Sequence, residues 1–107
     1  MKRDLPPIHP SEILQEDFMS PFGITPSELA ESIHVPVEQL NDFLTQNKPL
    51  TANLALRLAR YFATDAQSWL NLQNHYDLEV MQDVLQDELR TFVKPFKFKS
   101  NQMPQFC

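Results

Sequence analysis

Two residue types are nearly absent from this sequence, which contains one glycine, Gly23, and one cysteine, Cys107, in 107 residues. A single cysteine cannot form a disulfide within the chain, and this favours a reducing cytoplasm. Scarce glycine beside nine prolines favours short helices separated by rigid breaks. The length allows one domain around a single hydrophobic core, and we expect that domain to be all-α.

Long hydrophobic runs are also missing. No apolar run approaches the roughly 18 residues that a membrane-spanning helix needs. The first ten residues, MKRDLPPIHP, lack the apolar segment of a signal peptide. We therefore expect a cytoplasmic protein that has no membrane partner.

The patterns that carry catalysis or metal binding do not occur either. There is no pair of carboxylates at a fixed separation, no Ser-His-Asp grouping and no glycine-rich phosphate loop. The residues His9, His34, His75 and Cys107 do not have the spacing of metal ligands. We expect no enzymatic activity, no metal, no cofactor and no small-molecule substrate.

The net charge of −5 by itself argues against nucleic acid, because neutralised phosphates supply most non-specific affinity. The charges are segregated, however. Between residues 65 and 88 there are six carboxylates and no basic residue, namely Asp65, Asp77, Glu79, Asp83, Asp87 and Glu88. From Leu89 onward every charged residue is basic. This pattern is typical of a partner surface or a dimer contact, and equally of a solvated face.

Helix signals recur along the chain. A first helix is predicted from about Pro10 through the segment SEILQEDFM, stopping before Pro21. The clearest start is Thr25, followed by Pro26 and by Glu28 three residues after the cap. A break at residues 34–36 separates this second helix from a third by about three residues, so the two must turn sharply, as in a helix-turn-helix.

The third helix, starting near Val37, is predicted to be amphipathic. Leu40, Phe43 and Leu44 are spaced i, i+3, i+4 and should be buried. The opposite face then carries polar residues, namely Glu38, Asn41, Asp42 and Thr45, with Gln39 and Gln46 at its flanks.

Three further segments are predicted. Thr51 caps a fourth helix over NLALRLARYF, and Asp65 caps a fifth over AQSWLNLQNHYDL, in which Trp69, Leu72 and Tyr76 belong to the core. A separate acidic helix with Leu78, Met81, Leu85 and Leu89 should follow, and then an extended arm around Pro95. Arg57 and Arg60 have two candidate roles. One is a contact with phosphate or with a partner protein, and the commoner one is a salt bridge to a carboxylate.

The proposed dimer contact comprises Leu85, Leu89, Phe92, Phe96 and Phe98, because these apolar residues come after the core is complete.

Three segments together resemble a known family. They are IHPSEILQEDFMSPFGIT, LTANLALRLARYFATDAQSWLNLQ and YDLEV, and they are similar to the HigA (VapI-like) antitoxins of the Xre/Cro-type helix-turn-helix class. The resemblance runs from about Ile8 to about Val80. It implies a five-helix, lambda-repressor-like domain over residues 10–76, after an N-terminal extension at 1–9 and before a C-terminal helix and basic arm at 77–107.

The resemblance also implies a function. HigA proteins form dimers that bind an operator in their own toxin–antitoxin operon, repress it, and neutralise a HigB-type mRNA endonuclease. This sequence departs from the family pattern at His34, where the family usually has glycine. It also has Glu38, Gln39 and Gln46 at positions where basic, hydroxyl or glycine residues are common.

Two non-enzymatic functions remain open. If the chain reads DNA, the third helix lies in the major groove, with base contacts from Val37, Glu38, Gln39, Asn41 and Asp42. Phosphate contacts would come from Ser27, Thr45, Asn47 and Lys48. The recognition helices of a dimer would then lie about 34 Å apart. If the third helix is a plain solvated surface, DNA binding is weak or absent, and residues 77–88 dock on a basic nuclease.

Overall fold

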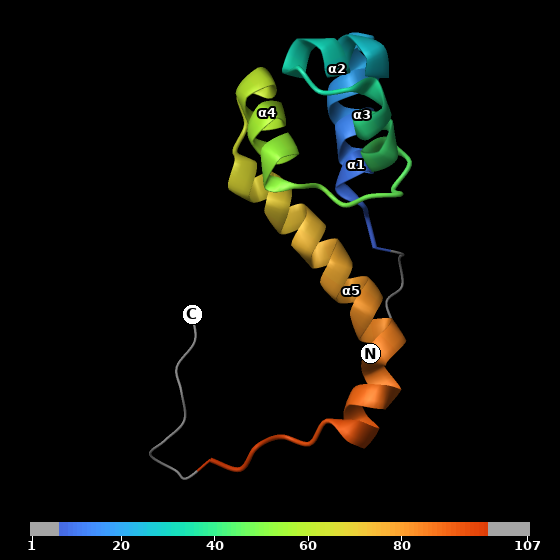
Figure 1. The fold of residues 1–107 in the computed structure, drawn as a ribbon, viewed down its shortest axis with the longest axis vertical. Coiled ribbons are helices and arrows are strands. Elements are labelled where there is room, and N and C mark those ends of the chain that lie inside the picture. The colour runs from blue at the N-terminus through green and yellow to red at the C-terminus, as the bar shows by residue number, and fades with distance from the viewer. Residues whose placement is uncertain (1–6, 99–107) are drawn as a thin grey trace.

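The computed structural model describes residues 7–98, which form five α-helices and no β-strand. Four short helices make a bundle, and the fifth starts against the bundle and runs out from it (Figure 1). The predicted all-α fold is confirmed. Residues 1–6 of the predicted extension and 99–107 of the predicted arm lie outside the described residues.

The first helical segment is less regular than predicted. Helix α1 covers only Pro10–Ile13, a π-helical turn follows at Leu14–Met19, and a 3-10 turn covers Ser20–Phe22. Pro21 has no N–H, and its ring would collide with the carbonyl of residue 17 in a regular α-helix. The wider turn, in which Ser20 N–H bonds to Gln15 O, relieves that conflict. The segment therefore continues past Pro21 and ends at Gly23, whose φ of 64° suits glycine.

Helices α2 (Pro26–Ile33) and α3 (Val37–Leu44) form the predicted pair. Thr25 and Glu28 make the predicted capping box at the start of α2. His34 ends α2 in the left-handed conformation, with φ 60° and ψ 51°. The turn thus keeps the geometry that glycine usually provides, and His34 accepts the steric cost.

Helix α4 (Ala52–Phe62) begins at its predicted cap, Thr51, and α5 (Ala66–Phe92) at its predicted cap, Asp65. The expectation of a separate acidic helix is wrong, because α5 continues without a break through residues 77–92. No glycine or proline occurs between Ala66 and Phe92 to interrupt it. The predicted boundary between 76 and 77 falls inside this helix, and residues 93–98 form neither helix nor strand.

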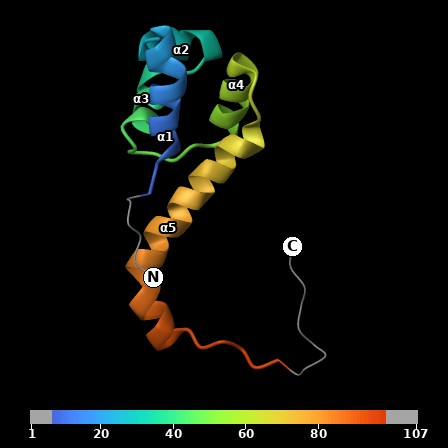
Figure 2. The same ribbon diagram turned by 180° about the vertical axis from the view of Figure 1, so that it is seen from behind.

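The hydrophobic core lies between α1 and α4 and against the first turns of α5. Leu14, Leu29, Leu40, Leu58 and Phe43 are at most 1% exposed, so the π-helical turn after α1 and the helices α2, α3 and α4 all contribute to it. Trp69 joins the core from α5, with Leu72 packed at its edge. In both views α3 and α4 lie on opposite sides of α1 (Figures 1 and 2), so the outer face of α3 turns away from α4.

Among residues 7–98, no helix has both the length and the apolar character required to cross a membrane.

Candidate nucleic-acid interface

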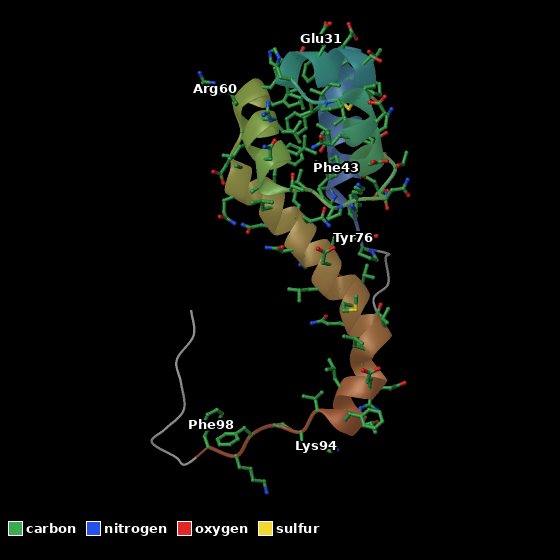
Figure 3. The ribbon with its side chains drawn as sticks, in the orientation of Figure 1. Glu31, Phe43, Arg60, Tyr76, Lys94 and Phe98 are labelled. Carbon is green, nitrogen blue, oxygen red and sulfur yellow. The ribbon has the colours of Figure 1, made fainter. Side chains whose placement is uncertain are left out.

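Helix α3 presents the polar face that the sequence predicts. Leu40, Phe43 and Leu44 are buried against the bundle, while Glu38, Gln39 and Asn41 are exposed. Figure 3 shows Phe43 within the bundle, at the side of α3 that faces α1. The predicted orientation of α3 is confirmed, and its outward side chains are of the kind that pair with base edges.

The other two predicted base contacts are less accessible. Val37 is half-buried and packs against the core, and Asp42 is also half-buried. The backbone of Asp42 has a structural task, because its carbonyl oxygen accepts from the amides of Asn47 and Lys48 at 2.9 and 3.1 Å. Among the predicted base contacts, Glu38, Gln39 and Asn41 thus present the most side-chain surface.

The segment after α3 carries three of the predicted phosphate contacts. Thr45, Asn47 and Lys48 are all exposed. The Thr45 hydroxyl donates to Asn41 O at 2.8 Å, so a phosphate contact by this donor would require the hydroxyl to turn. Gln46 has a φ of 65°, and this left-handed residue directs the chain back toward the bundle.

The fourth predicted phosphate contact, Ser27, is exposed in the first turn of α2. The N–H groups of a helix's first turn favour an anion. In this helix the Glu28 carboxylate already bonds to Thr25 N–H at 3.0 Å. That bond, together with the Thr25 side chain, holds the pKa of Glu28 below its ordinary value of 4.5.

The helix pair is acidic. Residues 26–47 contain Glu28, Glu31, Glu38 and Asp42 but no lysine or arginine. Lys48 is the single lysine or arginine between residues 4 and 56. Lys48 is therefore the one lysine or arginine that the helix pair and the segment after it can offer to a phosphate.

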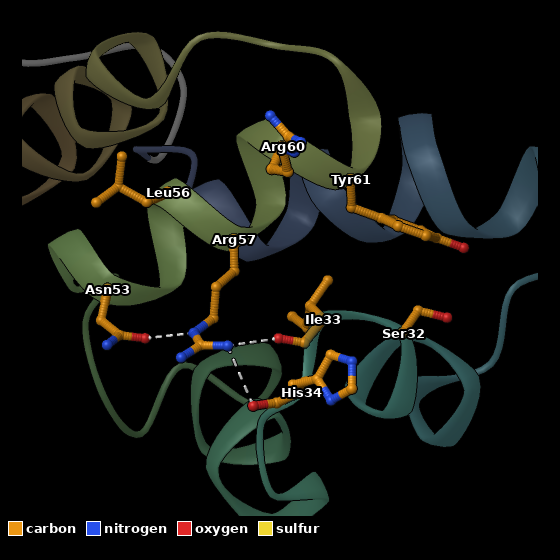
Figure 4. A pocket seen from close by; sticks show the side chains of 8 residues that line it. All are labelled: Ser32, Ile33, His34, Asn53, Leu56, Arg57, Arg60 and Tyr61. Carbon is orange, nitrogen blue, oxygen red and sulfur yellow. Dashed lines mark hydrogen bonds between the residues drawn. The ribbon is translucent and has the colours of Figure 1, made fainter.

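Arg57 has a structural role that sequence reasoning missed. Its guanidinium donates to Ile33 O at 2.9 Å, to His34 O at 3.3 Å and, through Nε, to Asn53 Oδ1 at 2.7 Å. Figure 4 shows the side chain reaching from α4 to the end of α2. The predicted salt bridge to a carboxylate is wrong for Arg57, because the orphan carbonyls at the C-terminus of α2 take its donors instead.

Arg60 lies on the same helix, three residues further on. It is exposed and makes no hydrogen bond or ion pair with any other residue of 7–98, so the expected salt bridge is absent there too. Arg57 and Arg60 line a pocket of about 420 Å³ between α2 and α4, together with Leu56 and Tyr61. Arg60, one of the residues that line this pocket, lies on α4 at the side of the bundle away from α3 (Figure 3).

His9 is a buried side chain that sequence reasoning excluded only as a metal ligand. Its Nδ1 accepts from Ser11 N–H at 3.1 Å, and Glu12 returns a bond to His9 N–H, which makes a capping box for α1. The ring contacts Phe43 of α3 and Tyr76 of α5, with centroids 5.5 and 4.8 Å away. Burial lowers the pKa of His9 from its ordinary 6.5, although the carboxylates of Asp77 and Glu12 oppose the shift. Pro10 followed by Glu12 was the available sequence signal.

Two glutamines also connect α3 and its following loop to the rest of the chain. Gln15 donates to Leu44 O at 3.2 Å, at the end of α3. Gln73 of α5 is buried and accepts from Leu50 N–H at 2.8 Å. No local pattern distinguishes these residues from the exposed glutamines, because their partners are 29 and 23 residues away.

The predicted dimer contact lies on the outer half of α5 and on the arm. Leu85 is half-buried, and the other four predicted residues are exposed in the single chain: Leu89, Phe92, Phe96 and Phe98. The rings of Phe96 and Phe98 meet edge to face with centroids 4.9 Å apart. Figure 3 places Phe98 and Lys94 far from the bundle, so this apolar surface has no partner among the described residues.

Among residues 7–98, no three or more His, Cys, Asp or Glu side chains are grouped as a metal site would require.

Two helices joined by a sharp turn, with the second exposing a polar face, define a helix-turn-helix domain. No protein-family model matches the chain. Virulence-associated protein I of Dichelobacter nodosus is 46% identical over 79 residues, covering 74% of this chain and 73% of that protein. Antitoxin HigA-1 of Vibrio cholerae is 35% identical over 89 residues, with 83% of each chain covered.

A solved structure is similar as well. The antitoxin HigA of Pseudomonas aeruginosa, determined with the higBA promoter, matches with a TM-score of 0.80 and 36% identity, covering 85% of this chain and 99% of that one. The chain therefore belongs to the HigA antitoxin family of helix-turn-helix proteins. The two HigA relatives are antitoxins rather than enzymes, which confirms the prediction of a non-enzymatic protein.

Proposed function

We propose that this chain is the antitoxin of a HigB/HigA-type module. As a homodimer in the cytoplasm it binds the operator of its own operon and represses transcription. It also neutralises a HigB-type mRNA endonuclease. The observation that carries the DNA-binding part is the exposed polar face of α3, with Glu38, Gln39 and Asn41 above a fully buried apolar face.

Asn41 is the central residue of the proposed base contacts. Its side chain is exposed in the middle of α3, and an asparagine amide can pair with adenine through two hydrogen bonds. Glu38 and Gln39 lie one turn earlier, where an acidic side chain can accept from the cytosine amino group and a glutamine can pair with adenine. Ser27, Thr45, Asn47 and Lys48 then hold the phosphates on either side.

The experiment is a gel-shift assay with DNA from upstream of the chain's own gene, repeated over a range of salt concentrations. The wild-type protein should retard this DNA, with affinity falling as salt rises. Asn41→Ala should lower the affinity by roughly 1–3 kcal/mol, while binding to the toxin stays unchanged. Asn74→Ala, at an exposed asparagine of α5 outside the helix pair, is the control and should keep wild-type affinity.

One observation favours a second function. Residues 26–47 contain four carboxylates and no lysine or arginine. In this alternative the chain neutralises the toxin without binding DNA, and residues 77–88 of α5 dock on a basic nuclease. Copurification with the product of the neighbouring gene tests the toxin partner in both cases. No retarded band at low salt with the pure protein would leave only this alternative.

The homodimer is proposed through the outer half of α5. The contact comprises Leu85, Leu89 and Phe92 on the helix, together with Phe96 and Phe98 on the arm, and all but Leu85 are exposed in the single chain. The helical part continues an apolar stripe that begins at Leu78 and Met81. An apolar stripe of this length is typical of a surface that a partner covers. A symmetric pair of chains would present two α3 helices, as a pseudo-palindromic operator requires.

A further inference from the structure

Gln73 is one of three buried polar or charged residues among those described, and its side chain is only 4% exposed. Both ends of its amide are engaged. The oxygen accepts from Leu50 N–H at 2.8 Å, and the nitrogen donates to Asp77 Oδ1 at 2.9 Å. A buried amide that is satisfied in this way holds its partners in fixed positions.

The segment that Gln73 holds is the one that follows α3. At one end, the amides of Asn47 and Lys48 donate to Asp42 O of α3. At the other end, the buried Leu50 donates to Gln73 of α5. Lys48 is thus held at its own amide and, two residues further on, through Leu50, and it is the single lysine or arginine between residues 4 and 56.

We propose that Gln73 is a positioning residue for DNA binding: through Leu50 N–H it fixes the segment 47–50, so that the Lys48 ammonium meets a backbone phosphate beside α3. This inference rests on the proposed operator binding. Gln73 itself lies on α5 and touches no DNA. It acts only through Lys48.

The test replaces Gln73 and measures how operator affinity depends on salt. Each phosphate neutralised contributes about 0.9 to the slope of log affinity against log salt. Gln73→Leu removes the acceptor for Leu50 N–H, and the slope should therefore fall in magnitude by about one, with roughly tenfold weaker binding at low salt. Lys48→Ala should produce the same change, and the double variant should lose no more than either single variant.

Gln67→Leu is the matched control. Gln67 is on the same helix and makes the same kind of bond to a residue four positions on, Asn71, but it is exposed and does not reach the segment 47–50. Its slope and affinity should equal those of the wild type. Gln73→Asn is the second variant in case Gln73→Leu does not fold, because it keeps an amide that is too short to reach Leu50.

The outcomes separate clearly. A wild-type slope in either folded Gln73 variant overturns the proposal, as does a double variant in which the two losses add. A lower melting temperature with an unchanged slope also overturns it, because that is what a purely structural role gives. Failure of the proposed function itself differs from all of these, because the wild-type chain would then retard no operator DNA.

Discussion

Replacing Arg57 with alanine should destabilise the chain by about 2 kcal/mol, because this side chain closes the end of α2. Its Nη1 donates to Ile33 O at 2.9 Å and to His34 O at 3.3 Å, and Asn53 holds the guanidinium through Nε. The bond to Ile33 O is partly buried, so water from the adjoining pocket replaces it only in part when Arg57 is removed.

The magnitude follows from these two bonds. A hydrogen bond from a charged donor contributes about 1.5–3 kcal/mol. The partly buried bond to Ile33 O should account for most of the effect, and the longer bond to His34, an exposed residue, should count little because water replaces it. The net expectation of about 2 kcal/mol allows for the freedom that the arginine side chain regains.

The assay is urea unfolding of Arg57→Ala and the wild type at one protein concentration, since association would otherwise change the apparent stability. In thermal unfolding, each 1 kcal/mol should lower Tm by roughly 4–8 °C in a domain of this size. Arg60→Ala is the control: it removes the same charge from the same helix, yet Arg60 has no partner among the described residues. Its effect should stay within about 0.5 kcal/mol.

Equal losses for Arg57→Ala and Arg60→Ala would refute the reasoning, because the effect would then reflect charge and not the bonds to α2. Arg57→Lys gives a further check. A lysine keeps the charge but lacks the planar fork that spans Asn53 and the two carbonyls. It should therefore recover only part of the lost stability.

Two other predictions concern pH and association. Burial lowers the pKa of His9 below 6.5, so its contribution to stability is fully present above pH 6.5 and is lost as pH falls through the lowered pKa. Urea unfolding between pH 7.5 and about 5.5 should show this loss of stability. His9→Asn keeps a capping acceptor that does not titrate in this range, so its stability should depend less on pH. A variant whose stability falls with pH as steeply as that of the wild type would contradict the role given to His9. Leu89→Gln should weaken self-association, measured by sedimentation equilibrium, by about tenfold or more. Thr91→Gln changes another exposed residue of α5 and should leave self-association unchanged. A dimer of wild-type affinity in Leu89→Gln would exclude the proposed contact.

The amino-acid sequence by itself determined where most helices begin and which faces they bury. Thr25, Thr51 and Asp65 each accept a bond from an amide three residues on, and such caps depend only on neighbouring residues. The buried face of α3 likewise follows from the spacing of its apolar residues. These features can be predicted because every interaction that defines them spans a few positions of the chain.

Other features were decided only when distant segments came together. Arg57 and Gln73 have polar side chains that are unremarkable in the sequence, but their partners lie 23 to 24 residues away. The continuity of α5 past residue 77 is different, because it is a local feature that the sequence prediction missed: no glycine or proline breaks the helix between Ala66 and Phe92. The positive φ of His34 accompanies local backbone bonds, including Val35 N–H to Ala30 O at 3.0 Å, and the bonds of Arg57 from α4 are added to that turn by the tertiary structure. Tertiary packing supplies the free energy that makes these side chains and this strained turn stable.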